Sequence, residues 1–307
     1  MRTLTVKRFS CISEATLTIA PITLLVGPQA SGKSILCKLS YFFVSLLGDQ
    51  VTAIAERTSH EDFIKQSKVK FIRWFTNETW GSQKFELSFN FGTASIDISR
   101  TISKGKAGKG VNVRFSEVLR DHYTGSLSRL EHKSANKSIG ADSTDFTFGT
   151  WNLERSIRED LRKSLGDEYV SSQIFIPAAR SFFTSIGRAI AAFESSNILD
   201  PLTLLFGRMY ASRGGQFHPE TPNDRAIHAL LKTATTTMLG GKLIRERDRE
   251  VLRTTDGRVI PLSALSSGQQ ELFPLLRVLP QGAIEVLEGL STLRSPKLTY
   301  FQMLRAA

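Results

Sequence analysis

The feature that most constrains this chain is an octapeptide near its N-terminus with fixed spacings of glycine, lysine and serine. It runs Gly27, Pro28, Gln29, Ala30, Ser31, Gly32, Lys33, Ser34, and it matches the pattern G-x-x-x-x-G-K-[ST] without a gap. A nearly continuous apolar run over 22–26 precedes it, and a helical pattern over 33–47 follows. Continuous apolar runs are typical of buried strands. The sequence therefore predicts a buried strand, a tight turn and a helix in this order.

This arrangement predicts a phosphate-binding loop. Gly27 and Gly32 let the backbone turn tightly, and backbone N–H groups and the helix N-terminus then point toward an anion. Lys33 is predicted to reach the β- and γ-phosphates of ATP, and the hydroxyl of Ser34 is predicted to hold Mg²⁺. All eight residues are candidate nucleotide ligands. The alternative is a strand-turn-helix joint that carries a surface lysine.

Patterning along the rest of the chain predicts an α/β fold with a mixed sheet. Short alternating strands at 3–6 and 15–19 precede the loop, and Asp256-Gly257 is a hairpin turn signal. The remaining predicted parts are a helix at 61–75, an antiparallel β-subdomain at 84–120, an exposed insertion at 124–150, a helix at 153–165, a buried strand at 173–177, a helical subdomain at 185–240 and a helix at 269–279.

Composition limits the classes of partner and compartment. Hydrophobic residues make up 41% and charged residues 22%, which is ordinary for a globular protein. The net charge of +11 favours polyanions such as nucleotides, DNA or RNA. No apolar stretch is long enough for a membrane span, and the N-terminus lacks the features of a signal peptide. Cys11 and Cys37 show neither a disulfide framework nor metal spacing, so we expect a cytoplasmic protein without a membrane partner.

A second motif lies far downstream. Leu265-Ser266-Ser267-Gly268-Gln269 resembles the L-S-G-G-Q signature of ABC-class ATPases. Together with the N-terminal strands and the phosphate loop, the layout resembles the ATPase heads of SMC, RecF and OLD-type proteins. It is closest to the bacterial "AAA family ATPase" group of that class, several members of which act in phage defence. The resemblance covers roughly residues 1–48 and 255–301.

This resemblance implies a P-loop NTPase fold with one ATPase head over 1–307. It also implies a homodimer that closes on ATP, in which Ser266, Ser267, Gly268 and Gln269 touch the nucleotide of the partner subunit. The family uses ATP and Mg²⁺, and DNA transactions or antiviral defence, with an effector protein as a possible partner, are the processes it suggests. A serine and a glycine at a helix start can bind an anion, but the same residues also form an ordinary helix cap.

A third stretch, Pro177-Ala178-Ala179-Arg180, is like the P-A-x-R element that follows a core strand in this bacterial group. Arg180 is expected either to approach phosphate or to brace the site. Gln173 is a candidate for the glutamine that senses Mg²⁺ and the attacking water. The alternatives are a surface arginine and a glutamine at the end of a strand.

The acidic residues of an ABC-class site are missing from their expected place. After Gly268 the acids are Glu271, Glu285 and Glu288, and none ends an apolar strand. Glu285 and Glu288 have the spacing of a solvated helix face. The segment 298–301 is a plausible core strand, but no carboxylate follows it. The catalytic residues are therefore unknown, and we expect a truncated, frameshifted or naturally degenerate chain with weak or absent hydrolysis.

Two other functions stay open. A regulatory subunit that binds nucleotide without hydrolysis fits the missing carboxylates, and a small-molecule P-loop kinase fits the phosphate loop alone. A glycine-rich basic loop over 103–110, with Lys104, Lys106 and Lys109 and with Arg100 and Arg114 nearby, predicts either contact with a nucleic-acid backbone or a solvated loop. The alternating charges at 245–250 predict a salt-bridged, solvated element.

Overall fold

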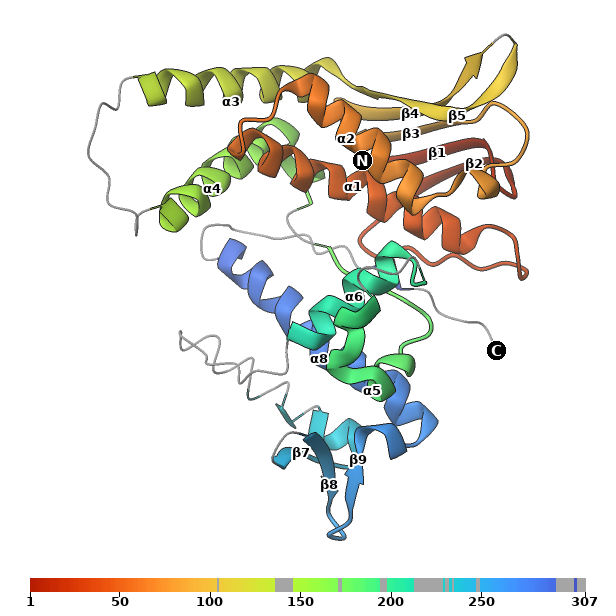
Figure 1. Cartoon of the computed structure of the whole chain (residues 1–307), viewed down its shortest axis with the longest axis vertical. Coiled ribbons are helices and arrows are strands. Elements are labelled where there is room, and N and C mark those ends of the chain that lie inside the picture. The colour runs from red at the N-terminus through yellow and green to blue at the C-terminus, as the bar shows by residue number, and fades with distance from the viewer. Residues whose placement is uncertain are drawn as a thin grey trace. The chain divides into compact units, whose positions relative to one another are not determined.

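The chain has a mixed α/β structure that divides into two compact units, Met1–Gln173 and Ile174–Ala307 (Figure 1). The coarse α/β prediction is confirmed. The computed structural model describes residues 1–103, 105–135, 146–170, 173–193, 198–212, 229, 232–233, 235–246, 249–290 and 301–302, with backbone only for 103, 133–135, 146–151, 188, 279–290 and 301–302.

The first unit is built on a five-stranded antiparallel sheet with the order β2-β1-β3-β4-β5. Alternation decides which side chains enter the core: Leu4 and Val6 are fully buried, while the neighbouring Thr3 and Thr5 are only partly covered. The predicted strands at 84–120 thus join the N-terminal hairpin in one sheet. The strands are β1 (Arg2–Phe9), β2 (Ile12–Ile19), β3 (Glu86–Phe91), β4 (Ala94–Ser103) and β5 (Lys106–Phe115).

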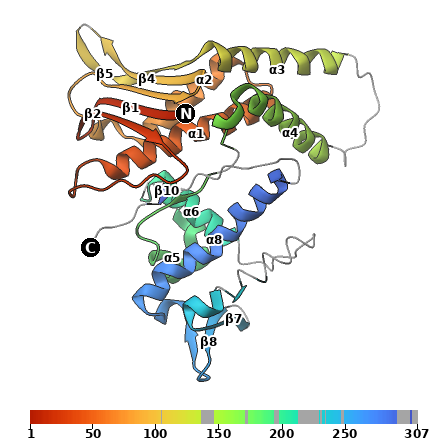
Figure 2. The ribbon, with the colours of Figure 1, turned by 180° about the vertical axis from the view of Figure 1, so that it is seen from behind.

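Helices α1 (Lys33–Ala55) and α2 (His60–Trp74) cover the buried face of this sheet (Figures 1 and 2). The predicted helices at 33–47 and 61–75 are confirmed, and α1 runs two turns further. Phe42 of α1 is fully buried and packs against Phe71 at 5.4 Å and Trp74 at 5.4 Å between ring centroids. Such tilted and edge-on ring pairs add to the burial of large apolar surface. The aromatic cluster comprises Phe9, Phe42, Phe43, Phe71, Trp74, Phe75, Trp80, Phe85, Phe89 and Phe91.

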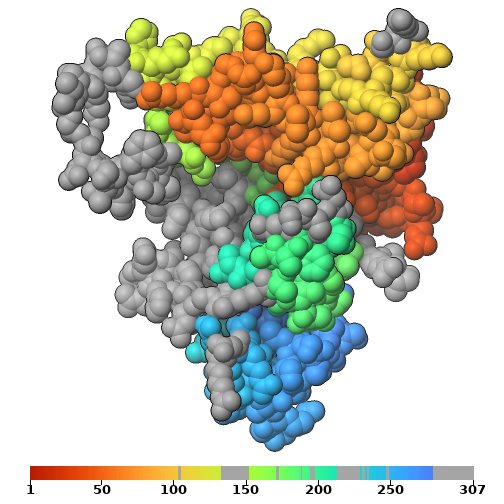
Figure 3. All heavy atoms as spheres, in the orientation of Figure 1, coloured from red at the N-terminus to blue at the C-terminus, as the bar shows by residue number. Residues whose placement is uncertain are grey.

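Helix α2 begins at a capping residue that the sequence supplies. The Ser59 hydroxyl accepts a hydrogen bond from the Asp62 backbone N–H at 3.1 Å, and the acids Glu61 and Asp62 occupy the first turn. Both features stabilise a helix N-terminus. In the space-filling view, α2 forms much of the surface of the first unit that faces the viewer (Figure 3).

Two further helices complete the first unit, α3 (Glu117–Ala135) and α4 (Phe146–Leu165). The helix predicted at 153–165 is confirmed within α4. Residues 124–135, predicted to belong to an exposed insertion, instead form the second half of α3, with Ser126 and Leu130 buried. The serine-rich composition of this segment favoured a loop in the prediction, whereas in the structure it is part of a helix that packs against α1 and α4. Residues 136–145 of the predicted insertion lie outside the described part of the chain.

The second unit contains a three-stranded antiparallel sheet and a two-stranded parallel pair. The Asp256-Gly257 turn joins two of these strands, as predicted. Phe301 and Gln302 pair in parallel with Phe175 and Ile176. The strand predicted at 173–177 is thus present, but it comprises only Phe175 and Ile176. Residues 298–300 lie outside the described part. The strands are β6 (Phe175–Ile176), β7 (Gly241–Glu246), β8 (Arg249–Thr254), β9 (Val259–Pro261) and β10 (Phe301–Gln302).

Helices pack around these strands with a core of their own. Phe183, Phe206 and Tyr210 form ring contacts at its centre, and Phe273 contacts Tyr210 edge-on. The described residues of the predicted helical subdomain at 185–240 are mostly helical, which agrees with the prediction. The helices are α5 (Phe182–Ile186), η4 (Gly187–Phe193), α6 (Pro201–Ser212), η5 (Leu262–Ala264) and α8 (Ser267–Leu290).

Candidate functional site

The octapeptide forms a turn that leads directly into α1. Ala30 and Gly32 both adopt left-handed backbone conformations, with φ of 60° and 88°. The Lys33 amine bends back into the turn and donates to the carbonyl oxygens of Gly27 at 2.6 Å and of Pro28, and it lies 3.3 Å from Ser31 Oγ. The loop thus encloses its own lysine. The Ser34 residue is exposed at the first turn of the helix.

The N-terminus of α1 has no side-chain cap. Gly32 is the N-cap residue and has no side chain to accept a hydrogen bond, and the first turn contains no acidic residue. The leading N–H groups of a helix have no partner within the helix, so they and the helix dipole favour an anion at this point. Lys33 is a cation at the same end, where the helix dipole opposes it. This local arrangement attracts negative charge.

The strand predicted at 22–26 is wrong for the described structure. These residues are in no sheet, and Ile22, Leu24 and Val26 are 90%, 66% and 80% exposed. After β2 the chain turns at Ala20, whose N–H donates to Thr23 Oγ1 at 3.0 Å, and then continues into the loop without helix or strand structure. A continuous apolar run forms a buried strand only where neighbouring strands and helices cover it, and the described residues of the first unit leave these three side chains exposed.

The second motif forms the start of α8 in the second unit. Ser266 Oγ accepts a hydrogen bond from the Gln269 backbone N–H at 3.4 Å. In return, Gln269 Oε1 accepts hydrogen bonds from the Ser266 backbone N–H at 2.9 Å and from the Ser266 hydroxyl at 3.0 Å. This reciprocal pair is a capping box. Gln269 Nε2 also donates to the Leu239 carbonyl at 2.7 Å. Two of the four predicted nucleotide contacts, Ser266 and Gln269, therefore cap the N-terminus of α8.

The other two predicted contacts of this motif are exposed. Ser267 and Gly268 occupy the first turn of α8, and a Cβ atom at Gly268 would meet nothing within 4 Å. The capping residues hold these two positions outward on an ordered helix N-terminus. The helix-cap alternative is thus present in the structure, and it leaves Ser267 and Gly268 accessible.

Arg180 lies against the same helix. Its Nε donates to the Glu271 carbonyl at 3.0 Å, and its Nη2 lies 3.4 Å from the Glu271 carboxylate. These contacts attach Arg180 to α8, and its expected role at the site, approach to phosphate or bracing, stays a prediction. The carboxylate of Glu271 is thus paired with Arg180. Glu271 is the one acid after Gly268 whose side chain the structure describes. The side chains of Glu285 and Glu288, which are predicted to form a solvated helix face, lie outside the described residues.

Gln173 belongs to the first unit and contacts α1. Its Nε2 donates to the Tyr41 carbonyl at 2.8 Å, while its buried Oε1 accepts no hydrogen bond from the described residues. Among the described residues, no group of three or more His, Cys, Asp or Glu could hold a metal ion. Ser34 therefore remains the sole metal ligand proposed from sequence.

The basic loop predicted at 103–110 is mostly strand. Lys106 and Lys109 belong to β5, where they and Arg114 are exposed, and Lys104 lies outside the described residues. A bulge after Arg100 absorbs the glycines, and a Cβ at Gly108 would lie 2.5 Å from Thr101 Oγ1. The Arg100 guanidinium forms contacts within the fold. It donates to the carbonyls of Gly108 at 2.7 Å and Gly81 at 2.6 Å and stacks over the Trp80 ring.

The charged run at 245–250 forms the ends of the β7–β8 hairpin. Arg245 pairs with Glu250 across the strands, and Glu246 pairs with Arg249. Arg253 lies 3.5 Å from the Glu246 carboxylate. These neighbours agree with the predicted salt-bridged element, while residues 247–248 lie outside the described part.

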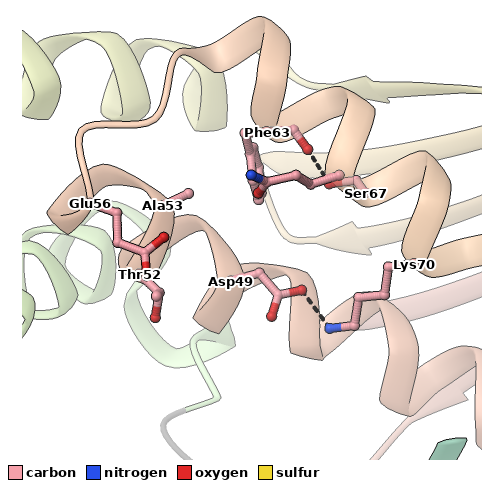
Figure 4. A pocket seen from close by; sticks show the side chains of 8 residues that line it. Asp49, Thr52, Ala53, Glu56, Phe63, Ser67 and Lys70 are labelled. Carbon is pink, nitrogen blue, oxygen red and sulfur yellow. Dashed lines mark hydrogen bonds and ion pairs between the residues drawn. The ribbon is translucent and has the colours of Figure 1, made fainter. Parts of the chain in front are cut away.

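One pocket was not predicted from the sequence. It has a volume of about 270 Å³ and lies between α1 and α2 (Figure 4). Of its lining residues, Phe63, Ala53 and Ser67 are buried, and Asp49 and Lys70 form an ion pair. Lys70 also donates to Ser45 Oγ at 2.9 Å and lies over the Trp74 ring. Its charge is therefore satisfied, and no predicted site residue lines the pocket.

No protein-family model matches the chain, and no curated protein matches it. Among the described residues, no helix is both long enough and apolar enough to cross a bilayer.

Proposed function

We propose that residues 27–34 bind the phosphates of ATP. The observation that carries this proposal is the start of α1, where an uncapped helix N-terminus without acids coincides with a lysine enclosed by a tight, glycine-containing turn. Placing a cation here and omitting a cap both cost helix stability. Local rules of this kind are commonly broken at functional sites.

The residues present fit a bound nucleotide. Backbone N–H groups of the turn and of the first turn of α1 would hold the phosphates, and the Lys33 amine would exchange its loop carbonyls for phosphate oxygens. The exposed Ser34 hydroxyl would hold Mg²⁺, which neutralises phosphate charge when bound. Gly27 is exposed and has no side chain that would stand between the phosphates and its backbone.

For the whole chain we propose an ABC-class ATPase head of the SMC, RecF and OLD-like type, which dimerises on ATP. Support comes from the order of the two motifs and from the exposure of Ser267 and Gly268 on an ordered helix start. A P-loop NTPase fold is part of this proposal. The parallel pairing of β6 with β10 is the kind of contact that such a fold contains.

A second candidate is a nucleotide-binding regulatory subunit without hydrolysis. It is favoured by Glu271, whose carboxylate pairs with Arg180 and is therefore not free to activate water. The two candidates share the nucleotide site and differ in turnover. Release of inorganic phosphate from ATP, measured with the Lys33→Ala variant as background, separates them.

Binding is tested with Lys33→Ala. The loss of charge-assisted hydrogen bonds, about 1.5–3 kcal/mol, should weaken ATP–Mg²⁺ binding by roughly ten- to hundredfold in isothermal calorimetry. Lys38→Ala is the matched control, because Lys38 is a cation on the same helix beyond its first turn. An unchanged affinity in Lys33→Ala refutes the site.

Dimerisation is tested with Gly268→Arg, which has open space and leaves the capping box intact. We expect normal ATP binding and loss of the ATP-dependent dimer in light scattering. Gly125→Arg is the matched control, since Gly125 is an exposed helical glycine of α3 that also has open space around it. A Gly268→Arg protein that still dimerises with ATP contradicts the role of this motif.

A further inference from the structure

The conformation of the phosphate loop depends on a contact with a side chain that lies outside the motif. Gly32, the second glycine of the motif, has φ of 88° and ψ of 4° and sets the direction in which α1 begins. It is buried, whereas residues 26–31 before it are exposed. Something outside the motif therefore covers the loop at this one point.

The cover comes from the turn between β1 and β2. A Cβ atom at Gly32 would lie 2.6 Å from Ile12 Cγ1, 2.9 Å from Ile12 Cδ1 and 3.3 Å from Cys11 Sγ. Real Cβ atoms do not approach neighbours at the first two distances. Glycine is thus required at residue 32 by the left-handed φ and, independently, by the Ile12 side chain.

The turn that carries Ile12 is itself firmly held. Phe9 and Ile12 pair across it, and both are buried. The Ser10 N–H donates to the Trp80 carbonyl at 3.2 Å, and the Phe9 ring meets the Phe85 ring edge-on at 4.8 Å. Ile12 is consequently a fixed surface, anchored in the aromatic cluster, against which the loop rests.

We propose that Ile12 is a positioning residue for the phosphate loop. Its side chain holds Gly32 in the left-handed conformation and so aims the first N–H groups of α1 and the Lys33 amine at the anion. The inference rests on the proposed binding of phosphate by residues 27–34. It adds that the affinity of this site is set partly by the β1–β2 turn.

The test compares Ile12→Ala with Ile19→Ala. Ile19 is equally buried at the other end of β2, pairs with Arg2 and is distant in register from the turn. Both variants lose a similar amount of packing, so both should lower the urea midpoint. Ile12→Ala alone should weaken ATP–Mg²⁺ binding, by about tenfold, as is usual when support behind a ligand-holding group is removed. Ile12→Val, which keeps the γ-carbon contact, should restore most of the affinity.

A double-mutant cycle tests the contact without ligand. Gly32→Ala should destabilise the chain, and adding Ile12→Ala should cost less than the sum of the two single changes, because the clash is relieved. Additive costs overturn the contact. Normal ATP affinity in Ile12→Ala, or equal losses in Ile12→Ala and Ile19→Ala, overturns the positioning role. If the wild-type chain binds no ATP, the proposed function fails and the inference fails with it, whereas the cycle still reports on the packing.

Discussion

Replacement of Gln269 by alanine gives the sharpest test of how the second motif is built. Its side-chain oxygen accepts two hydrogen bonds from Ser266, at 2.9 and 3.0 Å, and its amide donates to Leu239 at 2.7 Å. Each such bond contributes about 1 kcal/mol net. Ser266 is exposed, so water can replace part of its loss, and we expect Gln269→Ala to destabilise the second unit by about 2 kcal/mol.

The assay is hydrogen exchange together with urea unfolding. A loss of about 2 kcal/mol corresponds to roughly thirtyfold faster exchange of the amides that open with the unit. Ser267→Ala is the control, since Ser267 is exposed and forms no side-chain hydrogen bond to the described residues. It should stay within about 0.5 kcal/mol of the wild type. Equal stability of Gln269→Ala and the wild type would refute the capping assignment.

Three other outcomes are expected. Cys11 is exposed, whereas Cys37 is buried and burial raises its pKa, so Ellman's reagent should label one thiol rapidly in the folded chain and the second only on unfolding. Burial lowers the pKa of His122 below its ordinary value of 6.5, so the folded chain binds a proton at His122 less readily than the unfolded chain does. The urea midpoint of the wild type should therefore fall as the pH drops below 6.5, and the midpoint of His122→Gln should fall less. Gly207→Ala places a Cβ 2.7 Å from Ile190 and should destabilise α6 by about 1–3 kcal/mol in urea unfolding, despite the better helix propensity of alanine. Equally fast labelling of both thiols would contradict the first argument. A wild-type urea midpoint with the same pH dependence as that of His122→Gln would contradict the second, and unchanged stability of Gly207→Ala would contradict the third.

Local patterns predicted the helices and hairpins well, because their signals lie within a few residues. The Asp256-Gly257 turn, the helical spacing after Lys33 and the alternation of β1 all act locally. The capping box was also readable from the Ser266 and Gln269 spacing, although the resemblance drew attention to nucleotide contact instead.

The failures concern neighbours that only the fold supplies. The run at 22–26 is apolar enough for a core strand, but nothing in the run itself states which strands flank it. Arg100 looked like part of a basic loop, yet the carbonyls of Gly81 and Gly108 surround it. The contact of Ile12 with Gly32 joins two elements, and no spacing rule points to it.

The exposed segment before the phosphate loop also bears on how the protein behaves in concentrated solution. Exposed aliphatic side chains in a segment that belongs to no sheet can pair with the same segment of another molecule and so promote aggregation. Ile22, Leu24 and Val26 present this pattern among the described residues. The net charge of +11 keeps molecules apart at low ionic strength. Ammonium sulfate screens that repulsion and strengthens apolar association, so precipitation should begin through this segment, and an Ile22→Lys exchange should raise the salt concentration at which the protein leaves solution.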